Sequence, residues 1–160
     1  MLHSSLYQMM HFVIARRNAK AANVIANFSN VPLSVCDFSN VISRKDLALY
    51  AIILTLSEMN RTEIKAKVLK NAKVKEMMEA YPDGSNIFEN FLNGHFEAFQ
   101  QQMSAIEQHL QFDLMFGAHL KPEIFRKIRM LALRQYVLPY KIIDMRDIAK
   151  GFGCKLEDIE

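Results

Sequence analysis

The sequence predicts an all-α protein in which helical-repeat (TPR-like) hairpins lead into the start of a winged helix. Glycine and proline are scarce, with 5 and 4 copies in 160 residues, which favours long helices over a turn-rich β fold. Apolar residues recur at spacings of three and four along most of the chain. Residues 121–160 then show the order of a helix–turn–helix. We therefore predict a helical-repeat part over residues 1–120 and a winged-helix part over 121–160 that stops before the wing.

The first elements are expected to be an antiparallel helix pair, residues 2–16 and 18–28, joined at a polar corner. Small alanines in the second helix allow a close approach of the two helices. A long connection over residues 29–43 follows. Ser43 is the expected N-cap of the next helix, with Asp46 in its first turn, and this helix is apolar over a wide face. No strict repeat period is visible, so a regular solenoid is not predicted.

A capping signal at Asn60 and Glu63 predicts a lysine-rich helix over residues 61–75. Its lysines spread over more than one face, which favours a solvated surface, and an acidic protein partner is the main alternative. Two further helices are expected at 86–92 and 96–110, after a turn at 81–85. Gly117 is expected to end a short segment, and Pro122 to lie in the first turn of a long helix, where its missing N–H costs nothing.

The end of the chain carries the features that distinguish a DNA-binding helix–turn–helix from one that packs on other proteins. A short strand is predicted over Lys141–Ile143, and Asp144 is predicted to cap a helix over 145–150. Ile148, Phe152 and Leu156 are expected to form an apolar wedge between this helix and the next one. The start of that next helix is acidic, with carboxylates at 157, 158 and 160 against one lysine, and DNA phosphates would repel it. This argues for packing on protein and makes nucleic acid an improbable partner.

The sequence contains no pattern typical of a catalytic, cofactor or metal site. The five histidines are scattered without ligand spacing, and the two cysteines form no CxxC pair. No Gly-rich phosphate loop or nucleophile elbow is present. We therefore expect a non-enzyme with no cofactor, no metal and no small-molecule substrate. The longest apolar run, residues 47–56, is too short to span a bilayer, and no signal peptide is evident, so we expect no membrane association and a reduced intracellular compartment.

Several stretches resemble the PCI domain, a module shared by the proteasome lid, the COP9 signalosome and translation initiation factor 3. They include residues 132–136 (ALRQY), Pro139, Tyr140, Met145, Ala149, Phe152 and 156–160. Within that family the resemblance is strongest to subunit 1 of the COP9 signalosome, on residues 36–38, 60–64, 113–119 and 128–136. The corresponding helical-repeat subunit of the proteasome lid is the runner-up. Because further N-terminal repeats and the wing strands are missing, we expect a fragment of a larger subunit.

The resemblance implies an assembly role. PCI winged helices line up edge to edge, so the expected partners are other PCI subunits of one multi-subunit complex, in the cytoplasm and the nucleus. The COP9 signalosome removes a ubiquitin-like modifier from cullins, and its zinc site lies in another subunit, so a scaffold subunit is expected to be non-catalytic. The candidate interface residues are Tyr140, Ile142, Ile143 and Met145, at the edge of the predicted strand. The alternatives are that these four residues fill the core, or that the chain is a nucleic-acid-binding winged helix.

Overall fold

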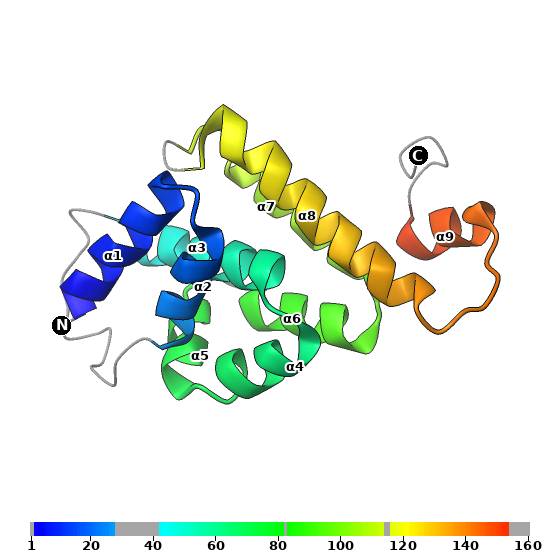
Figure 1. Ribbon diagram of the computed structural model, residues 1–160, viewed down its shortest axis with the longest axis horizontal. Coiled ribbons are helices and arrows are strands. Elements are labelled where there is room, and N and C mark those ends of the chain that lie inside the picture. Colours follow the sequence, from blue (N-terminus) through cyan, green and yellow to red (C-terminus); the bar gives the residue numbers. More distant parts are fainter. Residues whose placement is uncertain (1, 28–41, 82, 114–115, 154–160) are drawn as a thin grey trace.

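The computed structural model describes residues 2–27, 42–81, 83–113 and 116–153, and these are helical with short connections. Figure 1 shows the arrangement. The helices are, in order, α1 (Leu2–Ile14), α2 (Asn18–Ala26), α3 (Arg44–Glu58), α4 (Arg61–Glu63), the π-helix η2 (Ile64–Val68), α5 (Ala72–Met78), α6 (Gly84–Asn93), α7 (Phe96–His109), α8 (Gly117–Val137) and α9 (Met145–Phe152). No strand occurs within the described ranges, and the all-α class is confirmed.

The first two helices form the expected hairpin. α1 buries an apolar stripe against α2, and the alanines of α2 are buried at the contact. The chain reverses at Arg16, whose φ of 55° lies in the left-handed region. The predicted second helix ends at Ala26 rather than at Phe28, and most of the predicted connection over 29–43 lies outside the described residues.

α3 is the central helix, because every residue from Leu47 to Ser57 is buried. A helix that is apolar on all sides must be covered on all sides, and α2, α5, α6, α8 and η2 all contact it. Its two buried hydroxyls are satisfied within the helix. Thr55 Oγ1 donates to the carbonyl of Ala51 at 2.6 Å, and Ser57 Oγ donates to that of Leu54 at 3.1 Å.

The predicted caps of α3 and α4 are confirmed. Ser43 Oγ accepts a hydrogen bond from the backbone N–H of Asp46 at 3.0 Å. Asn60 and Glu63 form a reciprocal capping box, in which Asn60 Oδ1 accepts from the Glu63 N–H at 2.9 Å and Glu63 Oε2 accepts from the Asn60 N–H at 3.2 Å. The bond from Asn60, and then the one from Lys67, lower the pKa of Glu63. These caps fix where α3 and α4 begin.

The prediction of one lysine-rich helix over residues 61–75 is wrong. α4 continues into η2, where the Leu69 N–H bonds to the Ile64 carbonyl five residues back, and the chain then breaks before α5. At the break, Asn71 Nδ2 donates to the backbone carbonyl of Ala26 at 3.1 Å. This contact with α2 is a tertiary constraint that helical spacing alone does not reveal. Lys65, Lys67 and Lys70 are exposed.

The start of α8 also differs from the prediction. Gly117 begins this helix instead of ending a segment, so Pro122 lies beyond its first turn. The proline removes one bond to the carbonyl four residues back. Burial of Ile124, Phe125 and Ile128 on the α3 side outweighs that loss. The helix therefore crosses the predicted boundary at residue 120, and the division into two parts stays a prediction.

The predicted strand over Lys141–Ile143 is wrong as well, since these residues belong to a bent connection between α8 and α9. A strand needs a partner to bond its backbone, and the described residues place none there. The short helix that follows runs from Met145 to Phe152, two residues beyond the predicted end. Within the described residues, no helix is both long and apolar enough to cross a membrane.

A partly buried polar contact joins α3 to the turn between α7 and α8. The Tyr50 hydroxyl donates to Asp113 Oδ2 at 2.5 Å, and Asp113 Oδ1 accepts from the backbone N–H of Phe116 at 2.9 Å. The rings of Tyr50 and Phe116 also lie in contact, with centroids 4.7 Å apart. Asp113 thus connects the central helix to the residue that precedes α8.

We expect Tyr50→Phe to lower the free energy of unfolding by about 2 kcal/mol, the usual size of a hydrogen bond to a charged group. Burial, and then the hydrogen bond to Asp113, raise the pKa of Tyr50 well above 10. The unfolded chain ionises this phenol near pH 10 while the folded chain keeps it protonated. Stability is therefore lost as the pH rises above about 10, by at most about 1.4 kcal/mol per pH unit.

Urea titrations between pH 7 and 11 test this, with Tyr7→Phe as the control because the Tyr7 side chain is 55% exposed. The alkaline loss of stability should be smaller in Tyr50→Phe than in the wild type and unchanged in Tyr7→Phe. If the free energy of unfolding fell equally with pH in all three proteins, the raised pKa assigned to Tyr50 would be contradicted.

Candidate interaction surface

A cluster of three aromatic rings holds α9 against the rest of the molecule. Phe152 of α9 stacks on Phe96 of α7, with centroids 5.2 Å apart and an interplanar angle of 13°. Tyr136 of α8 packs edge-on against both rings, at 5.6 Å from Phe96 and 5.5 Å from Phe152. Stacked and edge-to-face pairs add stabilisation beyond their buried area. Three helices therefore meet at one contact, at the end of the molecule where Figure 1 shows α9.

The close approach of α9 to Tyr136 depends on Gly151. A Cβ at this position would lie 2.6 Å from the Tyr136 hydroxyl oxygen and 2.7 Å from the ring carbon that carries it. Both distances are shorter than any normal contact, so a larger residue would push the ring or the helix away. Gly151 is thus a packing residue.

The local sequence defines the limits of α9. Asp144 caps it by accepting a hydrogen bond from the Arg146 N–H at 2.9 Å, as predicted. Gly153 ends it with a φ of 60°, the left-handed geometry typical of a helix C-terminus. Ile148 and Phe152 are buried, so two members of the predicted apolar wedge face the core. The third, Leu156, lies outside the described residues.

The connection between α8 and α9 presents several large apolar side chains to solvent. Leu138 is 79% exposed, Tyr140 52%, Ile142 93% and Met145 42%. Ile143 differs from them, because it is half-buried and packs on the core. Three of the four predicted interface residues are therefore exposed, and the fourth contributes to the core. Scattered exposed apolar residues are normal, and a concentration of them in one short segment makes that segment a candidate contact surface.

This exposed set, Leu138, Tyr140, Ile142 and Met145, is called the connection surface below. It offers side chains and not the backbone edge that a strand would have given. Leu138 was not among the predicted interface residues. Its place directly before Pro139, where the helix must end, could have indicated an apolar residue exposed at the helix end. The basic residues Lys141 and Arg146 are also exposed beside it. Such a surface can bind an apolar patch on another protein.

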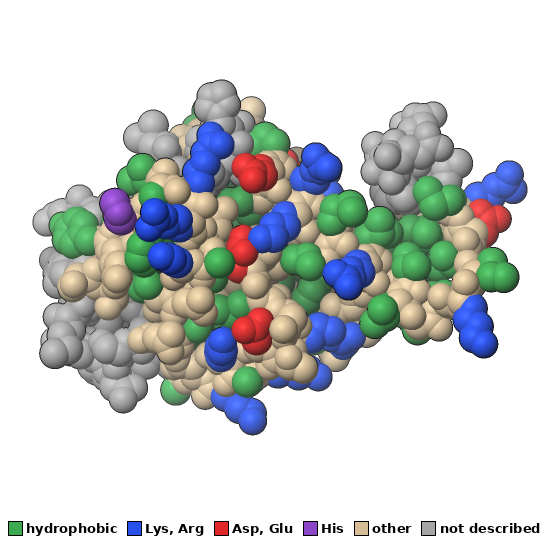
Figure 2. Space-filling view, viewed as in Figure 1, with side chains coloured by type: hydrophobic (Ala, Val, Ile, Leu, Met, Phe, Trp, Pro, Cys, Tyr) green, Lys and Arg blue, Asp and Glu red, His purple; other side chains and the backbone are tan. Residues whose placement is uncertain are grey.

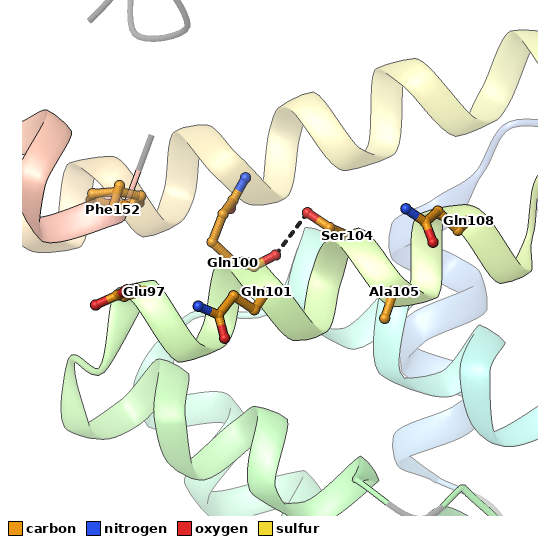
Figure 3. A pocket seen from close by; sticks show the side chains of 8 residues that line it. Glu97, Gln100, Gln101, Ser104, Ala105, Gln108 and Phe152 are labelled. Atoms are coloured by element: carbon orange, nitrogen blue, oxygen red, sulfur yellow. Dashed lines mark hydrogen bonds between the residues drawn. The ribbon is translucent and has the colours of Figure 1, made fainter. Parts of the chain in front are cut away.

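A hollow lies along α7 beside the end of α9 (Figure 3). It is lined mainly by amide, hydroxyl and methyl groups: Glu97, Gln100, Gln101, Ser104, Ala105, Gln108, Phe152 and Gly153. Ser104 Oγ donates to the backbone carbonyl of Gln100 at 2.9 Å, so this hydroxyl is engaged with its own helix. Among the described residues, no three His, Cys, Asp or Glu side chains are grouped so as to hold a metal ion.

Comparison with characterised proteins gives several relatives of one kind. COP9 signalosome complex subunit 1b of Drosophila melanogaster is 28% identical over 134 residues, which is 84% of this chain and 25% of the relative. COP9 signalosome complex subunit 1 of Arabidopsis thaliana is 25% identical over 123 residues, or 77% of this chain and 28% of the relative. This chain is similar to COP9 signalosome subunit 1. The resemblance inferred from the residues is thereby confirmed.

A second kind of relative also matches. The 26S proteasome non-ATPase regulatory subunit 6 of Oryza sativa subsp. japonica is 20% identical over 159 residues, covering 97% of this chain and 39% of the relative. Of the signalosome subunits named above, in contrast, the chain spans about a quarter of the length. No model of a protein family matches the sequence.

We expect Gly151→Ala to destabilise the protein by about 1–3 kcal/mol, because the new methyl group collides with the Tyr136 ring. In a Tyr136→Ala background, Gly151→Ala should instead raise the free energy of unfolding. There the collision is gone, and alanine is better than glycine in a helix by up to about 1 kcal/mol. Denaturant unfolding of the four proteins of this cycle measures both values. The same effect of Gly151→Ala in both backgrounds would show that the Tyr136 contact does not constrain this site.

Proposed function

We propose that the chain is part of a non-catalytic scaffold subunit of the COP9 signalosome. The supporting observation is the similarity to signalosome subunit 1 from several organisms, over 77% and 84% of the chain in the Arabidopsis and Drosophila proteins. An all-helical body with an exposed apolar connection fits a protein that works by binding other subunits. Through assembly, this subunit would contribute to cullin deneddylation and so to the regulation of ubiquitin ligases.

The proposal includes a PCI-type architecture, in which residues 1–120 are the helical-repeat part and 121–160 the start of the winged helix. The partners would be other PCI subunits of the same complex, and the subunit would act in the cytoplasm and the nucleus. The supporting contacts are those of α9, which is capped by Asp144 and held against α7 and α8 by Phe96, Tyr136 and Phe152. A short helix fixed in this way would present the connection surface in a defined orientation.

The second candidate is a scaffold subunit of the proteasome regulatory particle lid. It is favoured by the similarity to a 26S proteasome regulatory subunit over nearly the whole chain. Co-purification of the tagged full-length subunit from its native source, followed by mass spectrometry of the partners, distinguishes the two. Recovery of signalosome subunits supports the first proposal and recovery of proteasome subunits supports the second. Recovery of the subunit alone would contradict both.

We expect Ile142→Asp to weaken partner binding while leaving the fold intact. The Ile142 side chain is 93% exposed, so a charge there meets water in the free protein and a desolvated surface in the complex. A loss of about tenfold or more in affinity, or about 1.4 kcal/mol, would be measurable by co-purification and by titration with a recovered partner. Circular dichroism should show unchanged helical content.

Two variants control this experiment. Ile14→Asp places the same charge on α1 at a side chain that is 70% exposed, and it should bind partners normally. Ile143→Asp, next to the tested position, introduces a charge beside the core and should lower stability. If Ile142→Asp and Ile14→Asp behave alike, the connection surface is not the interface.

A nucleic-acid-binding winged helix remains the less favoured alternative. Around α9 the exposed charges are mixed, with Lys141, Arg146 and Lys150 against Asp144 and Asp147. We expect weak binding to duplex DNA with a shallow dependence on salt, because few phosphates would be neutralised. Titration of labelled duplex at 50 and 200 mM salt measures this. A fall in affinity of about 10³ or more between the two would instead indicate a true phosphate-binding surface.

A further inference from the structure

The outer face of α8 carries a line of three exposed side chains, Arg126, Met130 and Arg134. They are spaced four residues apart, so they lie one above the other on one side of the helix. The opposite side buries Ile124, Phe125, Ile128 and Ala132, and α8 contacts α3 and α7. Met130 lies between the two cations, and this apolar side chain is 57% exposed.

The neighbouring cations of α8 are already paired within the molecule. Lys127 Nζ lies 2.7 Å from Glu58 Oε1 of α3, and Arg129 Nη2 lies 2.8 Å from Glu107 Oε2 of α7. Arg126 and Arg134 form no ion pair with any other residue that the structure describes. The two guanidinium groups of the outer line are therefore available to a partner, with one exposed carboxylate, that of Glu123, a turn before Arg126.

The same face is hollowed between Pro122, Glu123, Arg126, Lys127 and Met130. Apolar atoms of Pro122 and Met130 border this hollow, and Arg126 stands at its rim. Figure 2 shows Lys and Arg side chains, with some Asp and Glu and hydrophobic side chains between them, over the middle of this view, where Figure 1 shows α8. The hollow therefore surrounds Arg126, and Met130 borders it on the side of Arg134.

We propose that this face of α8 binds an acidic amphipathic helix of a partner protein. Arg126 and Arg134 are about 12 Å apart along the helix axis, which matches carboxylates eight residues apart on a second helix. An apolar residue midway between those carboxylates would pack on the exposed side chain of Met130. Rows of side chains four residues apart pack into the grooves of a facing helix, so this line can accept a helix by ordinary ridge packing. The site lies on α8 itself and goes beyond the interface proposed for the connection surface.

A display library of helical peptides, randomised on one face and selected on the immobilised protein, tests the proposal without assuming a partner. We expect enrichment of acidic–apolar–acidic residues at positions i, i+4 and i+8. The enriched peptide should then bind Arg126→Glu/Arg134→Glu at least about tenfold more weakly, because two attractive charge pairs become repulsive. A peptide with lysines at the two acidic positions should recover binding to that variant.

The control variant is Lys65→Glu/Lys75→Glu, which changes the net charge equally at two exposed positions away from α8, on η2 and α5. It should bind the enriched peptide as the wild type does. Enrichment of purely apolar or basic peptides, no enrichment, or equal weakening in both variants would overturn the proposal. Duplex DNA binding that is lost in the Arg126→Glu/Arg134→Glu variant alone would also overturn it, because the face would then recognise phosphates.

Discussion

The structure depends on the burial of α3 on all of its sides. Every residue from Leu47 to Ser57 lies away from solvent, so this helix cannot exist without a complete cover. That cover is supplied by α2, η2, α5, α6 and α8. Each covering helix needs one apolar face only, and its other face is available for solvent or for a partner. The position of α8 on α3 is therefore a requirement of the core, and the surface that α8 presents follows from it.

Specific contacts then fix the C-terminal end relative to this core. Lys127 pairs with Glu58 on α3, and Gln135 Nε2 donates to the backbone carbonyl of Phe91 in α6 at 2.7 Å. Beyond the end of α8, the rings of Phe96 and Phe152 stack and hold α9. The connection between α8 and α9 is thus held at both ends by ordered helices. A surface on such a connection is pre-oriented, which reduces the entropy that binding must overcome.

The sequence predicted the parts of this fold that local chemistry determines. The caps at Ser43, Asn60 and Asp144 were found because a side-chain oxygen three or fewer residues from its N–H is a local signal. The break in the lysine-rich region was missed, because the contact of Asn71 with the Ala26 carbonyl joins two distant helices. The strand at residues 141–143 was wrong for a similar reason. β-Branched residues favour a strand only where a neighbouring strand is present, and the described residues contain none. The apolar residues of this segment could nevertheless be picked out as candidates, since their residue types are visible in the sequence.

Ile142 and Ile143 show why the residue type alone could not separate exposed side chains from those of the core. They are adjacent and identical in chemistry, yet one is 93% exposed and the other packs on the core. Neighbouring side chains on an irregular connection point in different directions, so only the fold assigns each its environment. Packing explains the hydrophobicity of Ile143. It does not explain that of Ile142, nor that of Leu138 at 79% exposure. Two large aliphatic side chains that lie mostly in solvent, on a segment fixed at both ends, are what the interface proposed for the connection surface rests on.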